Sequence, residues 1–313
     1  MILHDILSLL IFPGCLFLLF LGLVFQFVDR KLHARLQNRM GPPWFQPFSD
    51  LIKLLGKEEI IPEEADPVMF PLMPVFAVTG VIAAFFYIPL WNSQATYSFY
   101  GDVIVVIYLL TIPTFTFFLG GWYSSSLYSM VGAMRSQIQF FSYEVPLFLS
   151  VLASAMLAGT WSLSEMTKWY SNHPGYWMFN LIGFCVALVA LLGKLEKVPF
   201  DTPEAETEIV AGTFTEYSGR LLAFFRIALD IELVVGAALI AAVFLPFGFG
   251  LGPLLGFLVW LAKITFVIVL LTVARTIFAR MRIDQMIEFC WIYLAPAAFC
   301  QVLLCLVVKG VLR

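Results

Sequence analysis

The chain has 313 residues, of which 61% are hydrophobic and only 12% are charged. Soluble domains carry about 25% charged residues, and a mean hydropathy of +0.92 excludes a soluble globular protein. The formal net charge of −3 is too small to indicate a nucleic-acid partner. The composition therefore predicts an all-α polytopic protein in the lipid bilayer, with a single integral membrane domain over residues 1–313.

The first apolar run covers residues 6–28 and is followed directly by Asp29, Arg30 and Lys31. A run of about 20 apolar residues is long enough to cross the hydrocarbon core as a helix. A cleavable signal peptide has its basic residues before a shorter apolar core, whereas here they come after the run. We therefore expect a retained transmembrane helix.

A polar connection at residues 29–67 follows this span, and Gly41-Pro42-Pro43 interrupts any helix within it. After the break, apolar residues recur at near-helical spacing: Phe45, Phe48, Leu51, Ile52, Leu54 and Leu55. The pattern predicts a short amphipathic helix. Such a helix either lies in the membrane interface or packs on the other spans.

Seven further apolar runs predict seven more spans, which gives eight in all. They cover residues 69–90, 101–122, 137–160, 176–193, 223–245, 256–278 and 289–308. Of the 18 Lys and Arg residues, thirteen fall in the connections after spans one, three, five and seven, and three fall on the opposite side. The positive-inside rule therefore places the odd-numbered connections in the cytoplasm and both termini outside the cell membrane.

The connection after the fifth span contains the most acidic segment of the chain, residues 196–220. It holds six of the 21 carboxylates, which are Glu196, Asp201, Glu204, Glu206, Glu208 and Glu216. A solvated loop has no use for the apolar residues Ile209, Val210 and Phe214 among these acids, so burial is favoured. We expect the segment to line a water-filled entry for protons or cations. The alternative is an ordinary solvated loop.

Within this segment, Thr202 and Pro203 are typical of the N-cap and first residue of a helix. On such a helix, Asp201, Glu204 and Glu208 fall within about 60° of one another, and Glu206 lies to the side. Three acids on one face repel each other unless they are protonated, paired or hydrated.

The fourth predicted span contains a further acid, Glu144, two residues before Pro146. The proline removes the helical donor for the carbonyl of Ser142, so a polar opening is expected beside an acid suited to proton exchange. The alternative is a permanent pair between Glu144 and a cation of another helix. Arg135 and Gln139 lie on the other face of this segment with Ser142.

The sixth predicted span carries Arg226, Asp230 and Glu232. Arg226 and Asp230 are four residues apart, which predicts an intrahelical pair. Glu232 lies about 200° round the helix from Asp230 and is the freer proton carrier. Lys263, on the seventh span, is one candidate partner for it.

The five cysteines show none of the spacings of an iron–sulfur or zinc site; they are Cys15, Cys185, Cys290, Cys300 and Cys305. We expect them to be small core residues. The three histidines are far apart in the sequence, and no glycine-rich phosphate loop is present. The chain is therefore expected to hold no metal or redox cofactor of its own.

Five motifs occur in one order along nearly the whole chain: DRKLHARLQNRMGPP, QPFSDLIKLLGKE, GAMRSQIQFFSYEVPL, EKVPFDTPEAETEIVAGTFTEYSGR and ARMRIDQMIEFCW. Together they resemble the eight-helix membrane subunit that joins the redox arm to the membrane arm in respiratory complex I and in related membrane-bound nickel–iron hydrogenases. The resemblance implies a subunit without cofactors that docks cytoplasmic subunits and adjoins antiporter-like membrane subunits. Iron–sulfur clusters and, in the hydrogenase branch, a nickel–iron centre are expected in those cytoplasmic partners.

The resemblance also implies roles for individual residues. A chain of acids is expected to lead from the redox site into the membrane: Glu144, Glu196, Asp201, Glu204, Glu206, Glu208, Glu216 and Glu232. Its expected cationic partners are Arg135, Arg220 and Arg282. The charged span residues Asp230 and Lys263 are assigned to the same ion path, and Arg226 is assigned to its cationic partners. Docking of the redox module is expected at Arg30, Lys31, Arg35, Arg39, Gln46, Asp50 and Lys53.

The connection GPPWFQP is short, as in the hydrogenase branch of this family, and favours a hydrogenase-type or ferredoxin-linked complex. The leading hypothesis is a coupling subunit that links electron transfer to proton or sodium translocation. One alternative is a quinone-binding subunit whose quinone entry is formed by residues 29–57. Another is a passive membrane anchor.

Overall fold

The computed structural model describes residues 7–90, 92, 94–204, 206–248 and 251–312, and over these residues it contains helices and no strands. Seven helices in this part of the chain are long and apolar enough to cross a membrane: Leu7–Leu36, Asp102–Tyr123, Leu127–Ala158, Pro174–Lys194, Gly219–Phe244, Pro253–Ile277 and Ile283–Val311. A further apolar helix, Met69–Phe85, has 17 residues. The prediction of an all-α polytopic membrane protein with about eight spans is confirmed.

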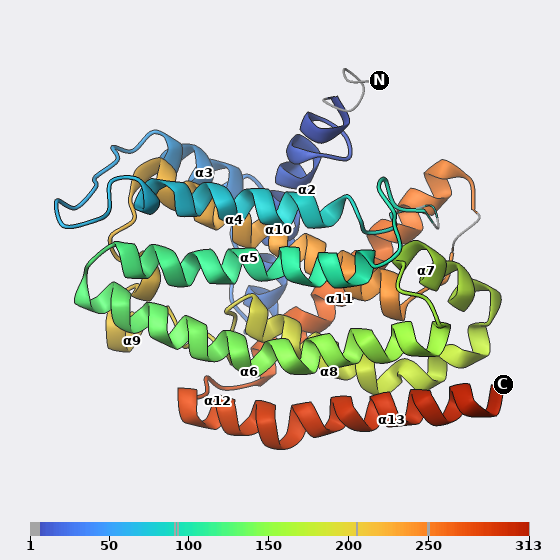
Figure 1. The fold of residues 1–313 in the computed structure, drawn as a ribbon. Helices are drawn as coiled ribbons and strands as arrows, with labels where there is room; N and C mark the ends of the chain where they lie inside the picture. The colour runs from blue at the N-terminus through green and yellow to red at the C-terminus, as the bar shows by residue number, and fades with distance from the viewer. Residues whose placement is uncertain (1–6, 91, 93, 205, 249–250, 313) are drawn as a thin grey trace.

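The helices follow one another along the chain as Figure 1 labels them. The first half contains α2 (Cys15–Leu36), α3 (Gln46–Leu55), α4 (Met69–Phe85), α5 (Asp102–Tyr123), α6 (Leu127–Ala158) and α7 (Leu163–Asn172). The second half contains η1 (Pro174–Asn180), α8 (Leu181–Lys194), α9 (Glu206–Ile209), η2 (Gly212–Phe214), α10 (Gly219–Phe244), α11 (Pro253–Ile277), α12 (Ile283–Phe289), the π-helical η3 (Cys290–Leu294) and α13 (Ala295–Leu312).

Two helices extend well beyond the apolar runs that predict them. Helix α2 continues to Leu36, past the predicted end at residue 28, and α6 begins at Leu127, before the predicted start at residue 137. Both extensions are held by other segments. Asp29 is buried on α2, and a Cβ on Gly132 of α6 would lie 2.6 Å from the backbone nitrogen of Thr213. Hydropathy marks where polar residues begin, whereas tertiary contacts decide where a helix ends.

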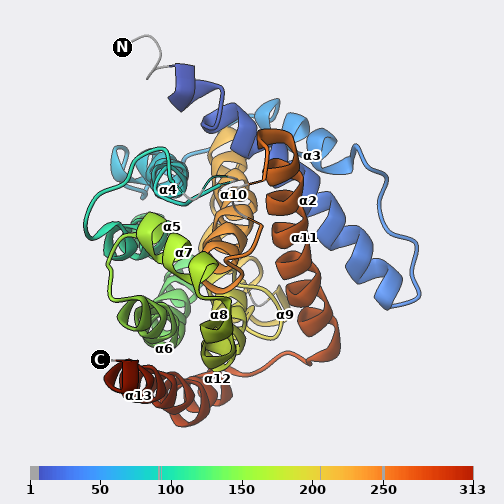
Figure 2. The ribbon, with the colours of Figure 1, turned by 90° about the vertical axis from the view of Figure 1, so that its right-hand side faces the viewer.

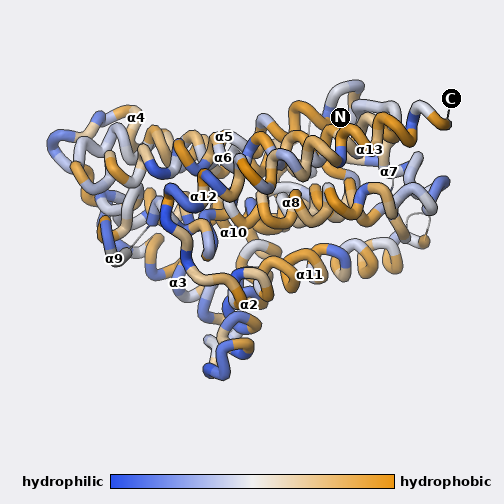
Figure 3. Tube along the Cα trace, turned by 90° about the horizontal axis from the view of Figure 1, so that it is seen from below, coloured by the Kyte–Doolittle hydropathy of each residue, from blue (hydrophilic) through white to orange (hydrophobic). Residues whose placement is uncertain are grey.

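The long helices form one bundle. In Figure 1, α3, α9 and α12 lie toward one end of the bundle, and α7 and the C-terminus lie toward the other. The view along the bundle in Figure 2 shows α10 in the middle, with α2 and α11 on one side and α4, α5 and α6 on the other. Figure 3 shows that α8, α11 and α13 are largely apolar, while polar residues gather where α9 and α12 lie.

Helix α10 lies at the centre of the bundle, and small residues at its contacts allow neighbouring helices to pack closely against it. It contacts α2, α4, α8 and α11, and its last 14 residues, from Ile231 to Phe244, are all buried. A Cβ on Gly22 of α2 would lie 3.2 Å from the carbonyl carbon of Asp230. The α2 and α10 backbones are therefore close at this crossing, which brings the following turns of α2 beside the charged part of α10.

The helix predicted after the Gly-Pro-Pro break is present as α3. It contacts α2 and α10, and its Pro47 is buried. Phe45, Ile52 and Leu55 remain exposed. The helix therefore packs on the spans with one face and presents apolar side chains on another.

The cysteine prediction is only partly correct. Cys290 and Cys305 are buried, whereas Cys185 and Cys300 are exposed on the surface of the chain. An apolar residue in a membrane span gains little from facing the core, since lipid tails are as apolar as the interior.

Candidate functional site

A polar cavity of about 380 Å³ lies where α2, α10 and α11 meet the segment that follows α8. Its charged lining residues are Asp29, Arg30, Glu196, Lys197, Asp201, Glu204, Arg226, Asp230, Arg275 and Arg280. Six of the sequence-predicted site residues are among them, from three separate parts of the chain: Arg30, Glu196, Asp201, Glu204, Arg226 and Asp230. The predicted burial of the acidic segment is correct for Glu196, Ile209 and Phe214, whereas Glu208 and Val210 are exposed.

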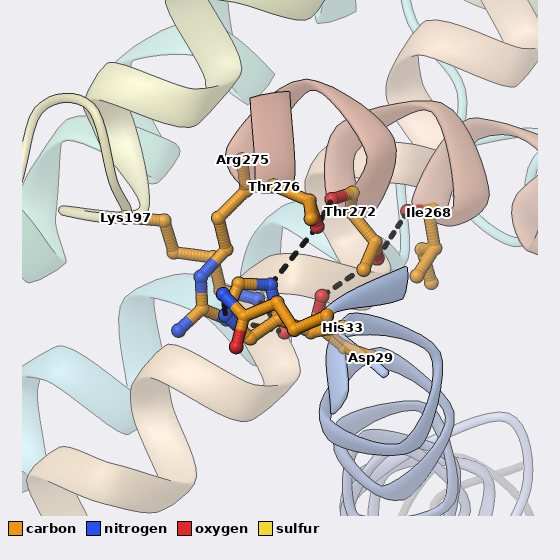
Figure 4. Close-up of polar contacts among 8 residues, drawn as sticks. Asp29, His33, Lys197, Ile268, Thr272, Arg275 and Thr276 are labelled. Carbon is orange, nitrogen blue, oxygen red and sulfur yellow. Dashed lines mark hydrogen bonds and ion pairs between the residues drawn. The ribbon is translucent and has the colours of Figure 1, made fainter. Parts of the chain in front are cut away.

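One wall of the cavity is an ion-pair network around Asp29 (Figure 4). Its Oδ2 accepts hydrogen bonds from Lys197 Nζ at 2.7 Å and from Arg275 Nη1 at 3.0 Å. Its Oδ1 accepts one from Thr272 Oγ1 at 2.7 Å. Because the three donors belong to α11 and the segment after α8, Asp29 fastens both of them to α2. The neighbouring His33 extends the network, with its Nδ1 3.0 Å from Thr276 Oγ1.

The floor of the cavity is the turn that ends α8. The amide of Glu196 donates to the carbonyl of Gly193 at 3.3 Å, and that of Lys197 donates to Leu192 at 3.2 Å. This pair of bonds is a Schellman motif, in which glycine is the usual residue at the left-handed position. Here Glu196 occupies that position with φ +50°. This backbone conformation costs free energy for a residue with a Cβ, and glycine would adopt it at lower cost. The chain nevertheless has a carboxylate side chain at this position.

The Glu196 side chain is buried with a single described partner. Ser136 Oγ of α6 donates to its Oε1 at 2.9 Å, while its Oε2 has no hydrogen-bond partner among the described residues. Burial, with the negative charge of Glu204 as a second cause, raises the pKa of Glu196 to about 8. The raised pKa favours the protonated, neutral form of Glu196.

The predicted helix at Thr202-Pro203 does not form. The described helix in this region is α9, which begins at Glu206 and has four residues. The Thr202 hydroxyl donates instead to Gln139 Oε1 at 2.5 Å, and Gln139 Nε2 donates to the carbonyl of Gly193 at 2.7 Å. Gln139 therefore joins α6, the end of α8 and the acidic segment. The Glu206 side chain lies outside the described part of the structure.

The three acids predicted to share a helix face each pair with a different arginine. The pairs are Asp201 with Arg280 at 3.1 Å, Glu204 with Arg226 at 3.0 Å, and Glu208 with Arg135 at 2.5 Å. A hydrogen bond and the charge of Arg135 lower the pKa of Glu208. Of the outcomes considered for these acids, pairing is the one found.

The predicted pair of Arg226 with Asp230 is therefore wrong. Arg226 lies 3.0 Å from Glu204, on a different segment, and its guanidinium lies over the ring of Phe214 at 5.7 Å. Asp230 lines the cavity beside it. An arginine on a helix reaches far enough to choose a partner from another segment, so spacing of four residues alone does not fix the pair.

Beneath the cavity, two buried acids share one lysine. Lys194 Nζ lies 3.7 Å from Glu144 Oε2 on α6 and 3.7 Å from Glu232 Oε1 on α10. The Lys194 and Glu232 side chains are almost completely buried, at 1% and 0% exposed, and Glu144 is 15% exposed. The prediction of Lys263 as the partner of Glu232 is wrong, because Lys194 at the end of α8 occupies that place. Glu144 lies beside a cation of another helix, Lys194 on α8, and shares it with Glu232.

The aromatic ring of Tyr143 closes this group on the α6 side. Its centroid lies 5.5 Å from Lys194 Nζ, and its hydroxyl is 2.9 Å from that of Thr114 on α5. Lys194 is therefore held among groups from α5, α6 and α10.

The remaining predicted residues lie outside the cavity, and their contacts also involve the cavity-lining Arg30. Arg220 pairs with Glu59 at 3.3 Å, and the backbone amide of Arg282 donates to Gln285 at the start of α12. Lys31 donates to the carbonyls of Gly41 and Pro42, Arg30 pairs with Asp50 at 3.0 Å, and Gln46 donates to Asp50. Glu216 is half-buried, and Arg35, Arg39 and Lys53 are exposed.

Sequence reasoning missed Lys194, Asp29 and Lys197. Lys194 follows an apolar run and looked like a loop charge, although two acids inside spans already required a buried cation. The need of Glu144 and Glu232 for a buried cation could therefore have pointed to Lys194. Asp29 looked like the polar end of a span, and the partners that bury it are 168 and 246 residues away in the chain.

The arrangement is a series of titratable and charged side chains at the end of the bundle. No group of three or more His, Cys, Asp or Glu side chains in the described part is placed to hold a metal ion. Glu196 faces the cavity, and the Glu144–Lys194–Glu232 group lies next to it through the turn of residues 194–196. Titratable groups therefore continue from the cavity into the bundle.

Comparison with known proteins gives consistent matches. Residues 8–306 match the family model described as NADH dehydrogenase. The chain is 34% identical over 310 residues to an NADH-quinone oxidoreductase subunit of Carboxydothermus hydrogenoformans, with 95% of this chain and 87% of that one covered. It is 36% identical over 292 residues to the corresponding subunit of Bacillus thuringiensis, covering 90% and 87%. Among solved structures, it is similar to a chain of the membrane-bound sulfane sulfur reductase, an archaeal respiratory membrane complex, with a TM-score of 0.84, 26% identity, and 97% and 99% covered.

Proposed function

Since the chain belongs to the NADH dehydrogenase family of complex I-like membrane subunits, we propose that it couples electron transfer to proton or sodium translocation across the membrane. Electron transfer takes place in a docked redox module, whose subunits supply the iron–sulfur clusters and any nickel–iron centre. This chain supplies the charged path that begins at the polar cavity. Antiporter-like membrane subunits beside it receive the change in protonation.

The observation that carries this proposal is the single lysine shared by two buried acids. Two unit charges about 4 Å apart interact by about 4 kcal/mol at an effective dielectric constant of 20, and Lys194 lies 3.7 Å from both carboxylates. Loss or gain of one proton in this group therefore changes the proton affinity of the others. A purely structural ion pair needs one acid and one base, whereas two acids on one lysine leave one carboxylate without a cation of its own.

The cavity gives this group a route to the redox side. The arginine-paired acids Asp201 and Glu204 line the cavity together with Glu196, whose pKa is raised to about 8. A negative charge that arrives in the docked module raises the proton affinity of Glu196 by the same electrostatics. The path then continues through Lys194 to Glu144 and Glu232.

The positive-inside rule supports placing this end of the bundle in the cytoplasm and both termini outside. The exposed basic residues at this end, Arg35, Arg39 and Lys53, are available for docking of the redox module. Arg30, Lys31 and Asp50 make contacts within the chain that shape the same surface.

Replacement of Glu144 by glutamine tests the coupling role. In sealed vesicles that contain the assembled complex, electron transfer from a low-potential donor is compared with uptake of protons and of sodium ions. Glu144→Gln should lower the ions moved per electron while assembly is retained. Glu165→Gln, a substitution of an exposed acid on α7, is the matched control and should leave the ratio unchanged. An unchanged ratio in Glu144→Gln would remove the basis of the proposal.

A quinone-binding function is the second candidate, and two observations favour it. The relatives of highest identity given above are named as subunits of NADH-quinone oxidoreductase. A smaller cavity of about 110 Å³ also lies between α2, α3 and α10, and it shares the lining residues Gln26, Arg30, Arg226 and Asp230 with the polar cavity. In this second proposal, the smaller cavity is the path by which a quinone enters the polar cavity beneath α3. Quinone reduction by the purified complex, lost on narrowing this approach with Leu54→Trp, would establish it.

The hydrogenase-type or ferredoxin-linked branch is supported by the short GPPWFQP connection and by the similarity to the sulfane sulfur reductase chain. Metal analysis and activity of the complex purified through this chain separate the branches. Nickel with hydrogen evolution indicates a hydrogenase, whereas quinone reduction without nickel indicates the quinone branch.

A further inference from the structure

Three buried polar residues of α6 form a column on the face of this helix that packs against α8. Ser136, Gln139 and Tyr143 are spaced by three and four residues, so they lie on one face of the helix. Each contacts a different part of the turn that ends α8. Ser136 donates to the Glu196 carboxylate at 2.9 Å, and the Tyr143 ring centroid lies 5.5 Å from Lys194 Nζ. Gln139 occupies the middle of this polar column.

The hydrogen bonds of Gln139 fix the orientation of its side-chain amide. Its Nε2 lies 2.7 Å from the carbonyl oxygen of Gly193, and its Oε1 lies 2.5 Å from the Thr202 hydroxyl. A backbone carbonyl can only accept, so the amide nitrogen must face Gly193 and the amide oxygen is left for Thr202. Gln139 therefore holds both partners in one orientation only.

The Gly193 carbonyl is an acceptor that closes the turn after α8. It also accepts from the backbone amide of Glu196 at 3.3 Å, in the turn that gives Glu196 its left-handed conformation with φ +50°. A Cβ on Gly193 would lie 3.1 Å from Tyr143 Cβ, so the end of α8 packs closely on the polar column. The Gln139 contact therefore helps to set the position of the turn that carries Lys194 and Glu196.

Thr202 connects Gln139 to the acidic segment. Its side chain is buried, and it lies between Asp201 and Glu204 in the chain, whose carboxylates pair with arginines at the polar cavity. A change of charge in the cavity acts first on these arginine pairs. Because Thr202 belongs to the same short stretch, a displacement of the pairs also acts on its bond to Gln139.

We propose that Gln139 is a positioning residue, through which the acidic segment controls the place of Lys194 between its two buried acids. This inference rests on the coupling function proposed above. While the Thr202 bond is in place, the Gln139 amide holds the turn, and Lys194 stays 3.7 Å from both carboxylates. When that bond is lost, the buried amide oxygen has no donor, so the amide turns and releases the Gly193 carbonyl. The resulting shift of Lys194 changes the proton affinity of the two acids.

The test measures the ions moved per electron by the assembled complex in sealed vesicles, with thermal unfolding as the check on folding. Thr202→Val keeps nearly the same shape and removes only the hydroxyl. It should lower the ions moved per electron by up to about fivefold, the change in an equilibrium that one neutral hydrogen bond produces, while electron transfer continues. Its melting temperature should fall by no more than about 4 °C. Thr202→Ser restores the hydroxyl and should retain the wild-type ratio.

A double-mutant cycle shows whether Thr202 acts through Gln139. Gln139→Leu should lower the ratio at least as far as Thr202→Val does, and adding Thr202→Val to it should change nothing more. Thr213→Val is the matched control, because Thr213 belongs to the same acidic segment and is completely buried, and its hydroxyl has no hydrogen-bond partner among the described residues. This control should leave the ratio unchanged.

Glu144→Gln, measured in parallel, separates this inference from the proposed function. If Glu144→Gln lowers the ratio and Thr202→Val does not, or if the effects of Thr202→Val and Gln139→Leu add, only the role of Gln139 is overturned. A loss in Thr202→Ser or Thr213→Val as large as that in Thr202→Val also overturns it. An unchanged ratio in Glu144→Gln overturns the proposed function, and the role of Gln139 with it.

Discussion

Replacement of Asp29 by asparagine tests whether its ion-pair network fastens the polar cavity together. Asparagine keeps the shape of the side chain and removes the charge that faces Lys197 and Arg275. Both cations then lose a hydrogen-bonded carboxylate and face each other beside a buried amide. We expect α2 to be held less firmly to α11 and to the segment after α8.

The magnitude follows from the burial of the partners. Removal of one member of a fully buried ion pair costs about 3–5 kcal/mol. Asp29 is 5% exposed, but Lys197 and Arg275 are 20% and 25% exposed and recover part of their hydration, which reduces the loss to about 2–4 kcal/mol. At about 2 °C per kcal/mol, the midpoint of thermal unfolding should fall by about 4–8 °C.

The assay is thermal unfolding of the assembled complex in detergent, followed by tryptophan fluorescence. Asp50→Asn is the matched control, because Asp50 also pairs with one arginine, Arg30, but both side chains are more than one-third exposed. The control should lose at most about 1 kcal/mol. Equal shifts for Asp29→Asn and Asp50→Asn would refute the reasoning that burial makes the Asp29 network strong.

Three further predictions concern the turn after α8, the arginine-paired acids and the α2–α10 crossing. The pKa of Glu196 is raised from 4.5 to about 8, so between these pH values the folded state retains a proton that the unfolded state loses. The free energy of unfolding should therefore fall as pH rises from about 4.5 to about 8, by up to about 5 kcal/mol. The difference in melting temperature between the wild type and Glu196→Gln, followed across this pH range, measures this loss of stability. Arg135→Gln should change the free energy of unfolding by no more than about 1 kcal/mol, because Glu208 is 53% exposed, and a larger loss in denaturation would show that the pair is buried by a partner. Gly22→Ala should cost about 1–3 kcal/mol in thermal unfolding, because its Cβ meets the Asp230 backbone, whereas Gly175→Ala meets nothing within 4 Å and should be neutral.

Hydropathy and periodicity predict the fold here because each membrane span is a local property of the sequence. The same methods place Glu196, Asp201 and Glu204 in a buried acidic segment, and the structure brings these residues to one cavity. Local rules fail where partners are distant in the chain. The pairs of Arg226 with Glu204 and of Lys194 with Glu232 depend on how separate helices pack, and no spacing rule contains that packing.

The Thr202-Pro203 signal failed for a related reason. Threonine caps a helix through a contact with its own following residues, whereas the Thr202 side chain is held by Gln139 on α6, a residue 63 positions away in the chain. The left-handed conformation of Glu196 was equally hidden, since a Schellman motif predicts glycine at that position. Glu196 lines the cavity, and Thr202 lies next to the cavity-lining Asp201, so both departures from local preference occur in the segment that forms the cavity.

The central claim is that Lys194 links the two buried acids of the ion path, and Lys194→Met tests it most directly. The measurement is the number of protons and sodium ions moved per electron by the assembled complex in sealed vesicles, with Lys194→Arg as the variant that keeps the charge. We predict that Lys194→Met continues to transfer electrons but moves few or no ions, and that Lys194→Arg retains much of the wild-type ratio. A wild-type ratio in Lys194→Met would contradict the claim.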